Sequence, residues 1–430
     1  MNWSRIYRLR SYLRSSLWVV PFIAIPLEIV IARLVHRVDV WLGWQLLGYG
    51  MQGAQGILQA IISSTLAFVV FTFGSILVAI QVASGQLTPR IIATTLLRDN
   101  VVKYTVGLFI FTLLFAISAL DRMDSTVHQL VMFVAALLGI SCFLAFLYLI
   151  DYAARLLRPI TVLAHVGREG LAVIDAVYPD PNRESPPNLQ NLRQNHLGIP
   201  SRVVQHEATS QIVLGVDVDG LVARAEQSNG AIEMVPQVGD FVAVDEPLFN
   251  LYGGAASIKD HILREAVAFG PERTMEQDPT FSFRIVIDIA IKALSPAIND
   301  PTTAVLAIDQ LHRLLRSVGR RNLRTDEISD RSGNLRVIIR TPNWEDFVSL
   351  AFSEIRQCGS NNLQIARRLR AMIENLLQTL PKHRHPALEQ QLSLLNREIE
   401  KNFSQPEELA LARVADSQGL GGHSGLTHLP

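Results

Sequence analysis

The sequence predicts a membrane α-helical protein with four transmembrane helices, followed by a cytoplasmic α+β region that holds a small β-barrel-sandwich-like module and further helices. Residues 17–150 are dense in Leu, Ile, Val, Phe and Ala. Residues 201–251 alternate apolar and polar positions, and the segments after residue 254 repeat apolar residues at helical spacing. A chain of 430 residues with 39 basic and 39 acidic side chains has room for several domains, and its charge does not favour nucleic acid as a partner.

Four apolar runs approach the length of about 20 helical residues that a bilayer core requires. They are residues 17–34, 57–82, 102–120 and 127–150. The first run follows a basic segment, residues 1–16, and lacks a small-residue cleavage site, so we expect a retained span rather than a signal peptide. The transmembrane domain is therefore expected to cover residues 17–158.

The basic residues of the short loops predict the orientation of the spans. They gather before the first span, between the second and third, and after the fourth: Arg5, Arg8, Arg10, Arg14, Arg90, Arg98, Lys103, Arg155 and Arg158. The loop at 121–126 holds a single arginine beside two aspartates. We therefore expect both termini, and everything after residue 151, on the cytoplasmic side, with membrane lipid as a partner.

The second span carries a stripe of mostly small and polar residues at alternating steps of four and three. The pore-lining candidates in this stripe are Ser63, Ala67, Gly74, Gln81, Ser84 and Thr88, with Val70 and Leu77 between them. Such a face allows helices to approach closely, or it lines a hydrated pore in an oligomer. Beyond it, Pro89 is expected to break the helix before a short amphipathic helix on the membrane surface.

An intramembrane charge, Glu28, lies in the first span. Carboxylates within spans are candidates for function because their burial in the bilayer is costly. The alternative is that Glu28 lies near the interface or pairs with Arg33.

After a connector at residues 159–200, the segment 201–254 is expected to form several short strands, with "DVDG" and "VGD" as turns. The piece "VGDFVAVDEPLFNLY" resembles half of a biotinyl- or lipoyl-type barrel-sandwich domain. Such carriers need an acceptor lysine, and no lysine occurs from residue 104 to residue 258, so a carrier function is excluded. No cofactor is expected.

Residues 255–410 read as a helical domain, and residues 411–430 as a disordered tail. "SIKDHILREAVAFG" is expected to be a helix that ends at Gly270. "FSFRIVIDIAIKAL" is expected to be a largely buried helix, and "TTAVLAIDQLHRLLRSVG" another that ends at Gly319.

The connection between these two helices, "ALSPAINDPTTAV" at residues 293–305, is the most unusual segment. Pro296 stops the first helix, Asp300 is a good N-cap, and Pro301 suits the first position of the next helix. A small ligand or ion could bind at this turn, or its polar groups could satisfy one another. The ligand-binding candidates of this region are Arg273, Asp278, Asp288, Ser295, Asn299, Asp300, Thr302 and Thr303.

Other classes of function lack a supporting pattern. No catalytic nucleophile with a matching base, phosphate loop, dinucleotide fingerprint or metal-ligand set is recognisable, so we expect no enzyme and no metal site. The cluster Arg313, Arg316, Arg320, Arg321 and Arg324 is expected to be a solvated face, with lipid headgroups as a secondary partner. The remaining hypotheses are a homo-oligomeric, channel-like or transport protein, or a membrane-tethered ligand sensor or scaffold without a pore.

The chain also resembles a known family. The run "FGPERTMEQDPTFSFRIVIDIAIKALSPAINDPTTAVLAID", together with "ASGQLTPR" after the second span, is similar to the signature of a bacterial membrane-protein family, domain of unknown function 2254. The resemblance implies an inner-membrane protein with an N-terminal membrane part and a cytoplasmic C-terminal part. It implies no particular activity.

Overall fold

The computed structural model describes residues 3–43, 48–86, 99–123, 127–156, 158–180, 198–323 and 326–421. The chain forms two compact units. One comprises Ser11–Val162, and the other comprises Met1–Arg10 together with Leu163–Pro430.

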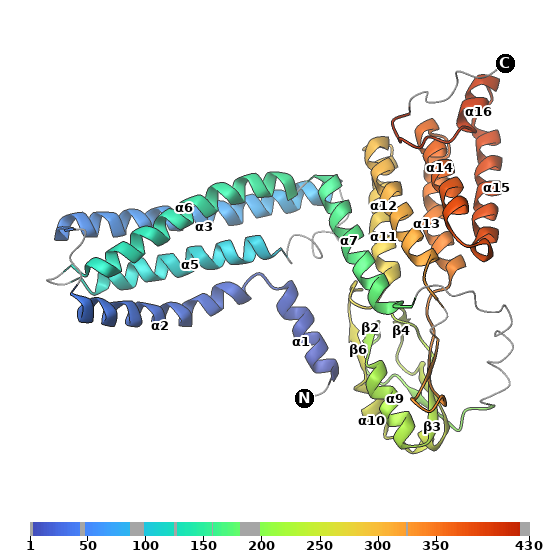
Figure 1. The fold of residues 1–430 in the computed structure, drawn as a ribbon, viewed down its shortest axis with the longest axis horizontal. Helices are drawn as coiled ribbons and strands as arrows, with labels where there is room; N and C mark the ends of the chain where they lie inside the picture. Colours follow the sequence, from blue (N-terminus) through green and yellow to red (C-terminus); the bar gives the residue numbers. More distant parts are fainter. Residues whose placement is uncertain are drawn as a thin grey trace. The chain divides into compact units, whose positions relative to one another are not determined.

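The first unit contains the four predicted spans, which are confirmed as helices long and apolar enough to cross a membrane. They are α2 (Val19–Leu42), α3 (Met51–Gln86), α5 (Asn100–Asp121) and α6 (Gln129–Leu156), and they lie side by side in Figure 1. A separate helix, α1 (Trp3–Ser15), precedes them. The amphipathic helix expected near Pro89 lies outside the described residues.

Helix α5 is the centre of this unit, because it packs against α2, α3 and α6. Half of its most apolar window (50%) is buried, compared with 17% for α3. Phe115, Ala116 and Ala119 of α5 meet Ala54, Leu58 and Ile61 of α3 in the largest apolar cluster of the unit. Part of the apolar surface of α3 is exposed, as expected for a helix surrounded by lipid, at Leu66, Val70, Phe71, Phe73, Leu77 and Val78.

The second unit contains a β region with two sheets. Its strands are β1 (Arg202–Gln205), β2 (Gln211–Val216), β3 (Gly230–Met234), β4 (Phe241–Val242), β5 (Pro247–Gly253), β6 (Val267–Gly270), β7 (Glu327–Ser329) and β8 (Leu335–Ile339). One sheet has the order β1-β5-β3-β8-β7 and the other β4-β2-β6. Helix α9 (Val218–Gln227) packs on β3 and β8. Two short helices, η2 (Gly254–Ser257) and α10 (Asp260–Arg264), follow β5 in the chain, and η2 also contacts α9.

Several sequence-based expectations for this region need correction. The barrel-sandwich-like module is not confirmed, because the described strands form small mixed sheets without a closed barrel. The segment "DVDG", expected as a turn, starts α9, since the Asp217 carboxylate caps the helix by accepting the Gly220 N–H. The helix expected to end at Gly270 is also wrong beyond α10, because Val267–Gly270 pair antiparallel with β2.

The sheet also recruits strands from far along the chain. Strand β8 runs parallel to β3, with Ile232 opposite Val337. This strand lies outside the segment 201–254, which the sequence predicts to form the β module by itself. Val337 and Ile339 are part of the same buried cluster as Ile232. Sequence periodicity does not identify such a pairing, because the two strands are separated in the chain by the helices α11 (Pro279–Leu294) and α12 (Pro301–Gly319).

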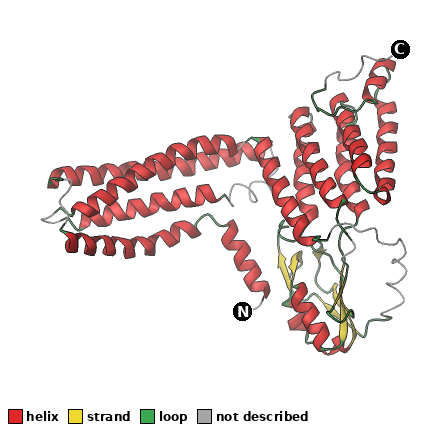
Figure 2. Cartoon of the chain, in the orientation of Figure 1, coloured by secondary structure: helices red, strands yellow, loops and turns green. Residues whose placement is uncertain are grey.

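The rest of the unit is a layer of helices, drawn red beside the yellow strands in Figure 2. They are α7 (Pro159–Val177), α11 (Pro279–Leu294), α12 (Pro301–Gly319), α13 (Trp344–Gly359), α14 (Leu363–Thr379), η3 (Lys382–Arg384), α15 (His385–Asn402) and α16 (Pro406–Ala412). Helix α11 packs against α12 and α13, and α14 packs against α12, α15 and α16. Carbonyls of residues 414–421 accept hydrogen bonds from Arg367 and Arg368, which hold this segment against α14.

Candidate functional site

The turn between α11 and α12 has the conformation that its sequence predicts. Ser295 is the C-cap of α11, and its hydroxyl donates to the Lys292 carbonyl at 2.7 Å. Asn299 adopts the left-handed conformation with φ of 48°, which Asn tolerates better than most residues. Asp300 then caps α12, and Pro301 takes the first helical position.

The polar groups of this turn mostly bind one another. The Asp300 carboxylate accepts both the backbone N–H of Thr303, at 3.1 Å, and the Thr303 hydroxyl, at 2.5 Å. The Asp300 N–H reaches back to the Ala293 carbonyl at 2.8 Å. Asn299 and Thr302 are exposed, so their side chains are the polar groups of the turn that remain open to solvent.

The start of α11 repeats this capping arrangement in a buried setting. Asp278 is only 2% exposed, and one of its carboxylate oxygens accepts the Phe281 N–H at 3.1 Å and the Thr280 hydroxyl. The neighbouring Gln277 side chain bonds to both backbone groups of Val216 in β2. The Gln277 side chain therefore anchors the start of α11 to the β region, whereas Asp278 bonds within its own helix turn.

The second oxygen of Asp278 is unusual because it has no hydrogen-bond partner among the described residues. Its nearest cation is the guanidinium of Arg273, at 3.6 Å, which is an ion pair without a hydrogen bond. Gly239, with φ of +94°, lies against this oxygen, where a Cβ would approach to 2.5 Å. Burial raises the pKa of the Asp278 carboxyl, and the Thr280 hydroxyl and Arg273 offset part of that rise.

Asp288 belongs to a third location, in the middle of α11. Its carboxylate accepts the Arg284 Nε–H at 2.6 Å, while the same guanidinium also binds Glu354 of α13. The hydrogen bonds that Arg284 donates to Glu354 raise the pKa of Arg284 and lower the pKa of Glu354. This is an ion-pair network between two packed helices.

The ligand-binding candidates therefore do not form one site. Arg273 and Asp278 lie at the N-terminal end of α11, Asp288 lies along it, and residues 295–303 lie at its C-terminal end. A helix of 16 residues is roughly 24 Å long. No small ligand can contact both ends at once.

The stripe of the second span lies on the open surface of the membrane unit. Ser63, Ala67, Gly74 and Gln81 are exposed, as are Val70 and Leu77 between them. Nothing lies within 4 Å of a Cβ built at Gly74. The side chain of Ser84 and the whole of Thr88 lie outside the described residues. Within one chain, α3 therefore packs through its opposite face, which carries Leu58, Thr65 and Thr72.

Glu28 is buried, at 4% exposure, between the helices of the membrane unit. Its Oε1 has no hydrogen-bond partner among the described residues, and no ion pair with Arg33 is formed there. The pairing with Arg33 is thus not observed in the described part of the chain. A carboxyl in this setting remains a candidate for function.

A polar cluster that the sequence does not reveal joins α2 to the start of α6. The Asp39 carboxylate lies 3.0 Å from Nδ1 of His128 and accepts the Leu130 N–H at 2.8 Å. The ring of His36 packs edge-on against that of His128, with centroids 4.3 Å apart. Asp39 and His128 are 89 residues apart, so only the fold brings them together. Across the described ranges, no group of three His, Cys, Asp or Glu is placed to hold a metal ion.

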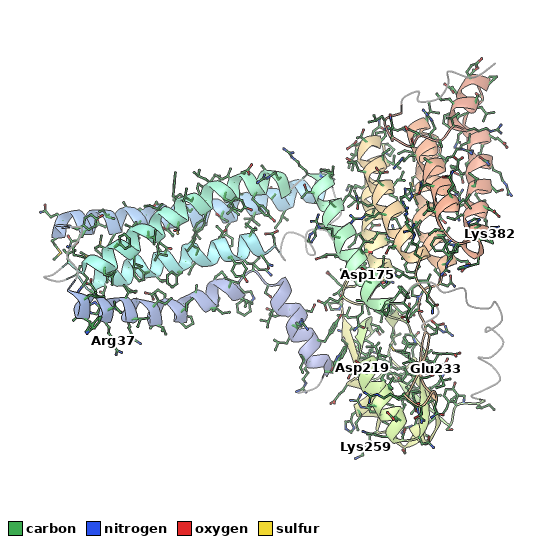
Figure 3. All side chains as sticks on the ribbon, in the orientation of Figure 1. Arg37, Asp175, Asp219, Glu233, Lys259 and Lys382 are labelled. Carbon is green, nitrogen blue, oxygen red and sulfur yellow. The ribbon has the colours of Figure 1, made fainter. Side chains whose placement is uncertain are left out.

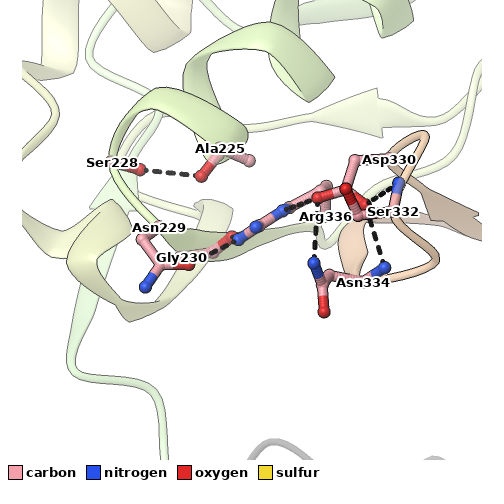
Figure 4. A network of polar contacts seen from close by, with 8 residues as sticks. All are labelled: Ala225, Ser228, Asn229, Gly230, Asp330, Ser332, Asn334 and Arg336. Carbon is pink, nitrogen blue, oxygen red and sulfur yellow. Dashed lines mark hydrogen bonds and ion pairs between the residues drawn. The ribbon is translucent and has the colours of Figure 1, made fainter.

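The polar network in Figure 4 is structural. Arg336 of β8 is buried and donates to Asp330, to the Asn229 side chain and to the Gly230 carbonyl. Hydrogen bonds from Arg336 and from the Asn334 backbone lower the pKa of Asp330 to about 2. Donors and acceptors are matched here, which fixes the β7–β8 hairpin against the start of β3.

Comparison with known proteins places the chain among membrane proteins. Residues 14–375 match the model of a family described as "Predicted membrane protein (DUF2254)". The chain is 24% identical over 424 residues to the uncharacterized proteins Mb1321c of Mycobacterium bovis and Rv1290c of Mycobacterium tuberculosis, in each case covering 93% of this chain and 79% of the relative. No solved structure matches the chain.

Proposed function

Because this chain belongs to the DUF2254 family of predicted membrane proteins, we propose that it acts as a homo-oligomer in the bacterial inner membrane, with a channel-like assembly around α3. The observation that carries this proposal is the open face of α3. Gly56, Ala60, Ser63, Ala67 and Gly74 follow one another at helical spacing, and all are exposed. These five residues are small, whereas Val70 and Leu77 on the same face are large, so the face is recessed at the small positions.

A recess of this kind fits another protein helix better than lipid. Small residues let two backbones approach closely, which increases dispersion contacts and hydrogen bonding between helices in a bilayer. At both Gly56 and Gly74, the position that a Cβ would take has no atom within 4 Å, so the contacts that small residues permit are not made within one chain. A second copy of the same face would supply them. Ser63 and Gln81 would bring polar groups to an axis between copies.

The N-terminal contact supports the proposed orientation. The Tyr7 hydroxyl donates to the Leu214 carbonyl at 3.1 Å, and residues up to Arg10 belong to the same compact unit as the C-terminal region. Four spans return the chain to the side from which it started. The basic residues of the first segment favour the cytoplasm as that side.

Cysteine cross-linking in the membrane tests the interface. The background would carry Cys358→Ser, because Cys358 is exposed while Cys142 is buried. We expect Ala67→Cys to form disulfide-linked dimers in native membranes. The matched control is Leu144→Cys, because Leu144 is also exposed in the membrane unit but lies on α6, so it should not cross-link.

Gly74→Leu tests whether the same interface supports conductance. Open space surrounds Gly74 within one chain, so the leucine should leave the monomer folded and block only the approach of another helix. We expect a smaller detergent-corrected mass by light scattering, and loss of conductance in planar bilayers. A monomeric wild-type protein, or wild-type bilayers that are silent under voltage and tension, would contradict the proposal.

A further inference from the structure

The C-terminal half of α12 borders an open cavity of about 760 Å³ in the second unit. Pockets for small molecules commonly have a volume of about 300–1,000 Å³. The lining side chains include an imidazole, a hydroxyl and several guanidiniums: His312, Arg313, Arg316, Ser317, Arg320 and Arg321. The wall of this cavity is thus rich in hydrogen-bond donors and positive charge.

Two charges at the edge of the cavity are already neutralised. Arg321 donates to the Asp175 carboxylate at 2.5 Å and to the Pro179 carbonyl at 3.0 Å, and Figure 3 labels Asp175 on α7. The Asp309 carboxylate accepts the Arg368 Nε–H at 2.6 Å. Neither pair contributes net charge to the cavity.

The remaining arginines have no such compensation. Arg313, Arg316 and Arg320 are exposed, and none forms an ion pair with a described carboxylate. They occupy positions i, i+3 and i+7, so they project from one face of α12. The rise of the helix spreads their backbones over roughly 10 Å.

This arrangement is not explained by the stability of the helix. Like charges three or four residues apart destabilise a helix. The C-terminal end of a helix dipole favours a nearby cation, but this favours a basic residue in the last turn and does not require three along one face. An anion in the cavity would attract all three guanidiniums and so offset the repulsion among them.

The scaffold beneath the arginines is rigid. The opposite face of α12, which includes Leu311, Leu314, Leu315 and Val318, is fully buried. His312 lies 2.9 Å from the Asn375 side chain of α14, which fixes the imidazole between the two helices. Burial lowers the pKa of His312, and the nearby guanidiniums of Arg368 and Arg316 lower it further. The imidazole is therefore neutral at neutral pH, and the cavity owes its charge to the arginines.

We propose that Arg313, Arg316 and Arg320 form a binding site for a multiply charged phosphate group. Guanidinium forks donate paired hydrogen bonds to phosphoryl oxygens, and three of them along one face suit a diphosphate or a phosphomonoester. Ser317, which lies between two of these arginines in sequence, adds a hydroxyl donor to the cavity wall. The phosphate comes from a soluble ligand or from a lipid headgroup. The site is independent of the α3 interface.

Binding experiments on the full-length protein separate the two sources. Pyrophosphate is titrated into detergent-solubilised protein in phosphate-free buffer by calorimetry. In parallel, short-chain phosphatidic acid, which carries a phosphomonoester, is titrated into the same solubilised protein and compared with short-chain phosphatidylserine, which does not carry one. Binding of pyrophosphate alone identifies a soluble ligand, and selective binding of phosphatidic acid identifies a headgroup.

The variant R316Q/R320Q should weaken the observed phosphate binding roughly tenfold or more, because charge-assisted hydrogen bonds are lost. The matched control is R397Q, since Arg397 is an exposed arginine on α15 away from the cavity. An unchanged melting temperature in both variants shows that the fold is kept. Equal binding by wild type and R316Q/R320Q, or no binding to either phosphate probe, would overturn the proposal, whatever the oligomeric state of the protein.

Discussion

Helices α11 and α12 both begin with Asp-Pro-Thr, and the two starts use the same local chemistry in different surroundings. In both, the aspartate carboxylate caps the helix and accepts a threonine hydroxyl. Asp300 uses both oxygens within its own turn, whereas Asp278 is buried against the β region with one oxygen left without a hydrogen bond among the described residues. Sequence determines the cap, and tertiary packing determines the charge environment of the carboxyl.

The largest loss of stability is expected from a substitution at Gly239, where the β region contacts Asp278. Gly239→Ala would combine backbone strain at φ of +94° with a Cβ 2.5 Å from the second Asp278 oxygen. Strain of this kind costs roughly 1–3 kcal/mol, and the contact adds to it. We expect the melting temperature of the second unit to fall by several degrees in differential scanning calorimetry.

Gly333→Ala is the matched control for this variant. Gly333 also has a positive φ, of +83°, but nothing lies within 4 Å of its Cβ position. The alanine should therefore cause strain alone and a smaller loss of stability. If the two variants lose the same amount, the close approach of Gly239 to Asp278 has no energetic consequence, and the proposed difference between the two helix starts is smaller than the geometry indicates.

The next prediction compares the loss of folding stability when each of the two capping aspartates is removed. Removing an N-cap side chain costs about 0.5–2 kcal/mol. We expect Asp278→Ala near the upper end, because the Phe281 N–H and the Thr280 hydroxyl lose their acceptor in a buried place where water cannot replace it. Asp300→Ala should lie near the lower end, because its partners are half-exposed. Urea unfolding of both variants measures the difference, and a larger loss for Asp300→Ala would refute this ranking.

The two caps also show which features of the fold can be predicted from the sequence and which cannot. Asp300, Pro301 and the end of α12 follow from residue chemistry, since capping and proline geometry act over three or four residues. The four spans follow equally from apolar length. The unsatisfied oxygen of Asp278 does not follow, because it depends on Gly239, which is 39 positions earlier in the chain. The pairing of β8 with β3 and the contact of His36 with His128 are hidden for the same reason.

A smaller, pH-dependent effect should distinguish Asp278 from a neutral isostere. The folded pKa of this carboxyl is raised above its usual value of 3.8 by burial. The folded protein therefore favours the protonated carboxyl. This stabilisation is fully present below the pKa that Asp278 has in the unfolded chain, and it is lost as pH rises through the pKa in the folded protein. We expect Asp278→Asn, which keeps a cap acceptor, to gain stability relative to wild type as pH rises from acid to neutral. The melting temperatures of the two proteins across that range measure this, and parallel profiles would show that the carboxyl titrates normally.

The smallest effect is expected at the exposed turn before α12. Asn299 has φ of 48° and its side chain faces solvent, so Asn299→Gly should change stability by only a few tenths of a kcal/mol. Asn299→Ala should be less stable, by roughly 1–2 kcal/mol, because alanine resists the left-handed conformation. Where the proposed conductance is detected for the wild type, its retention by both the glycine and the alanine variant would show that the residue serves the turn alone. A glycine variant with the wild-type melting temperature but without that conductance would instead show that the Asn299 side chain has a role beyond the turn, and that the two helix starts differ in function as well as in burial.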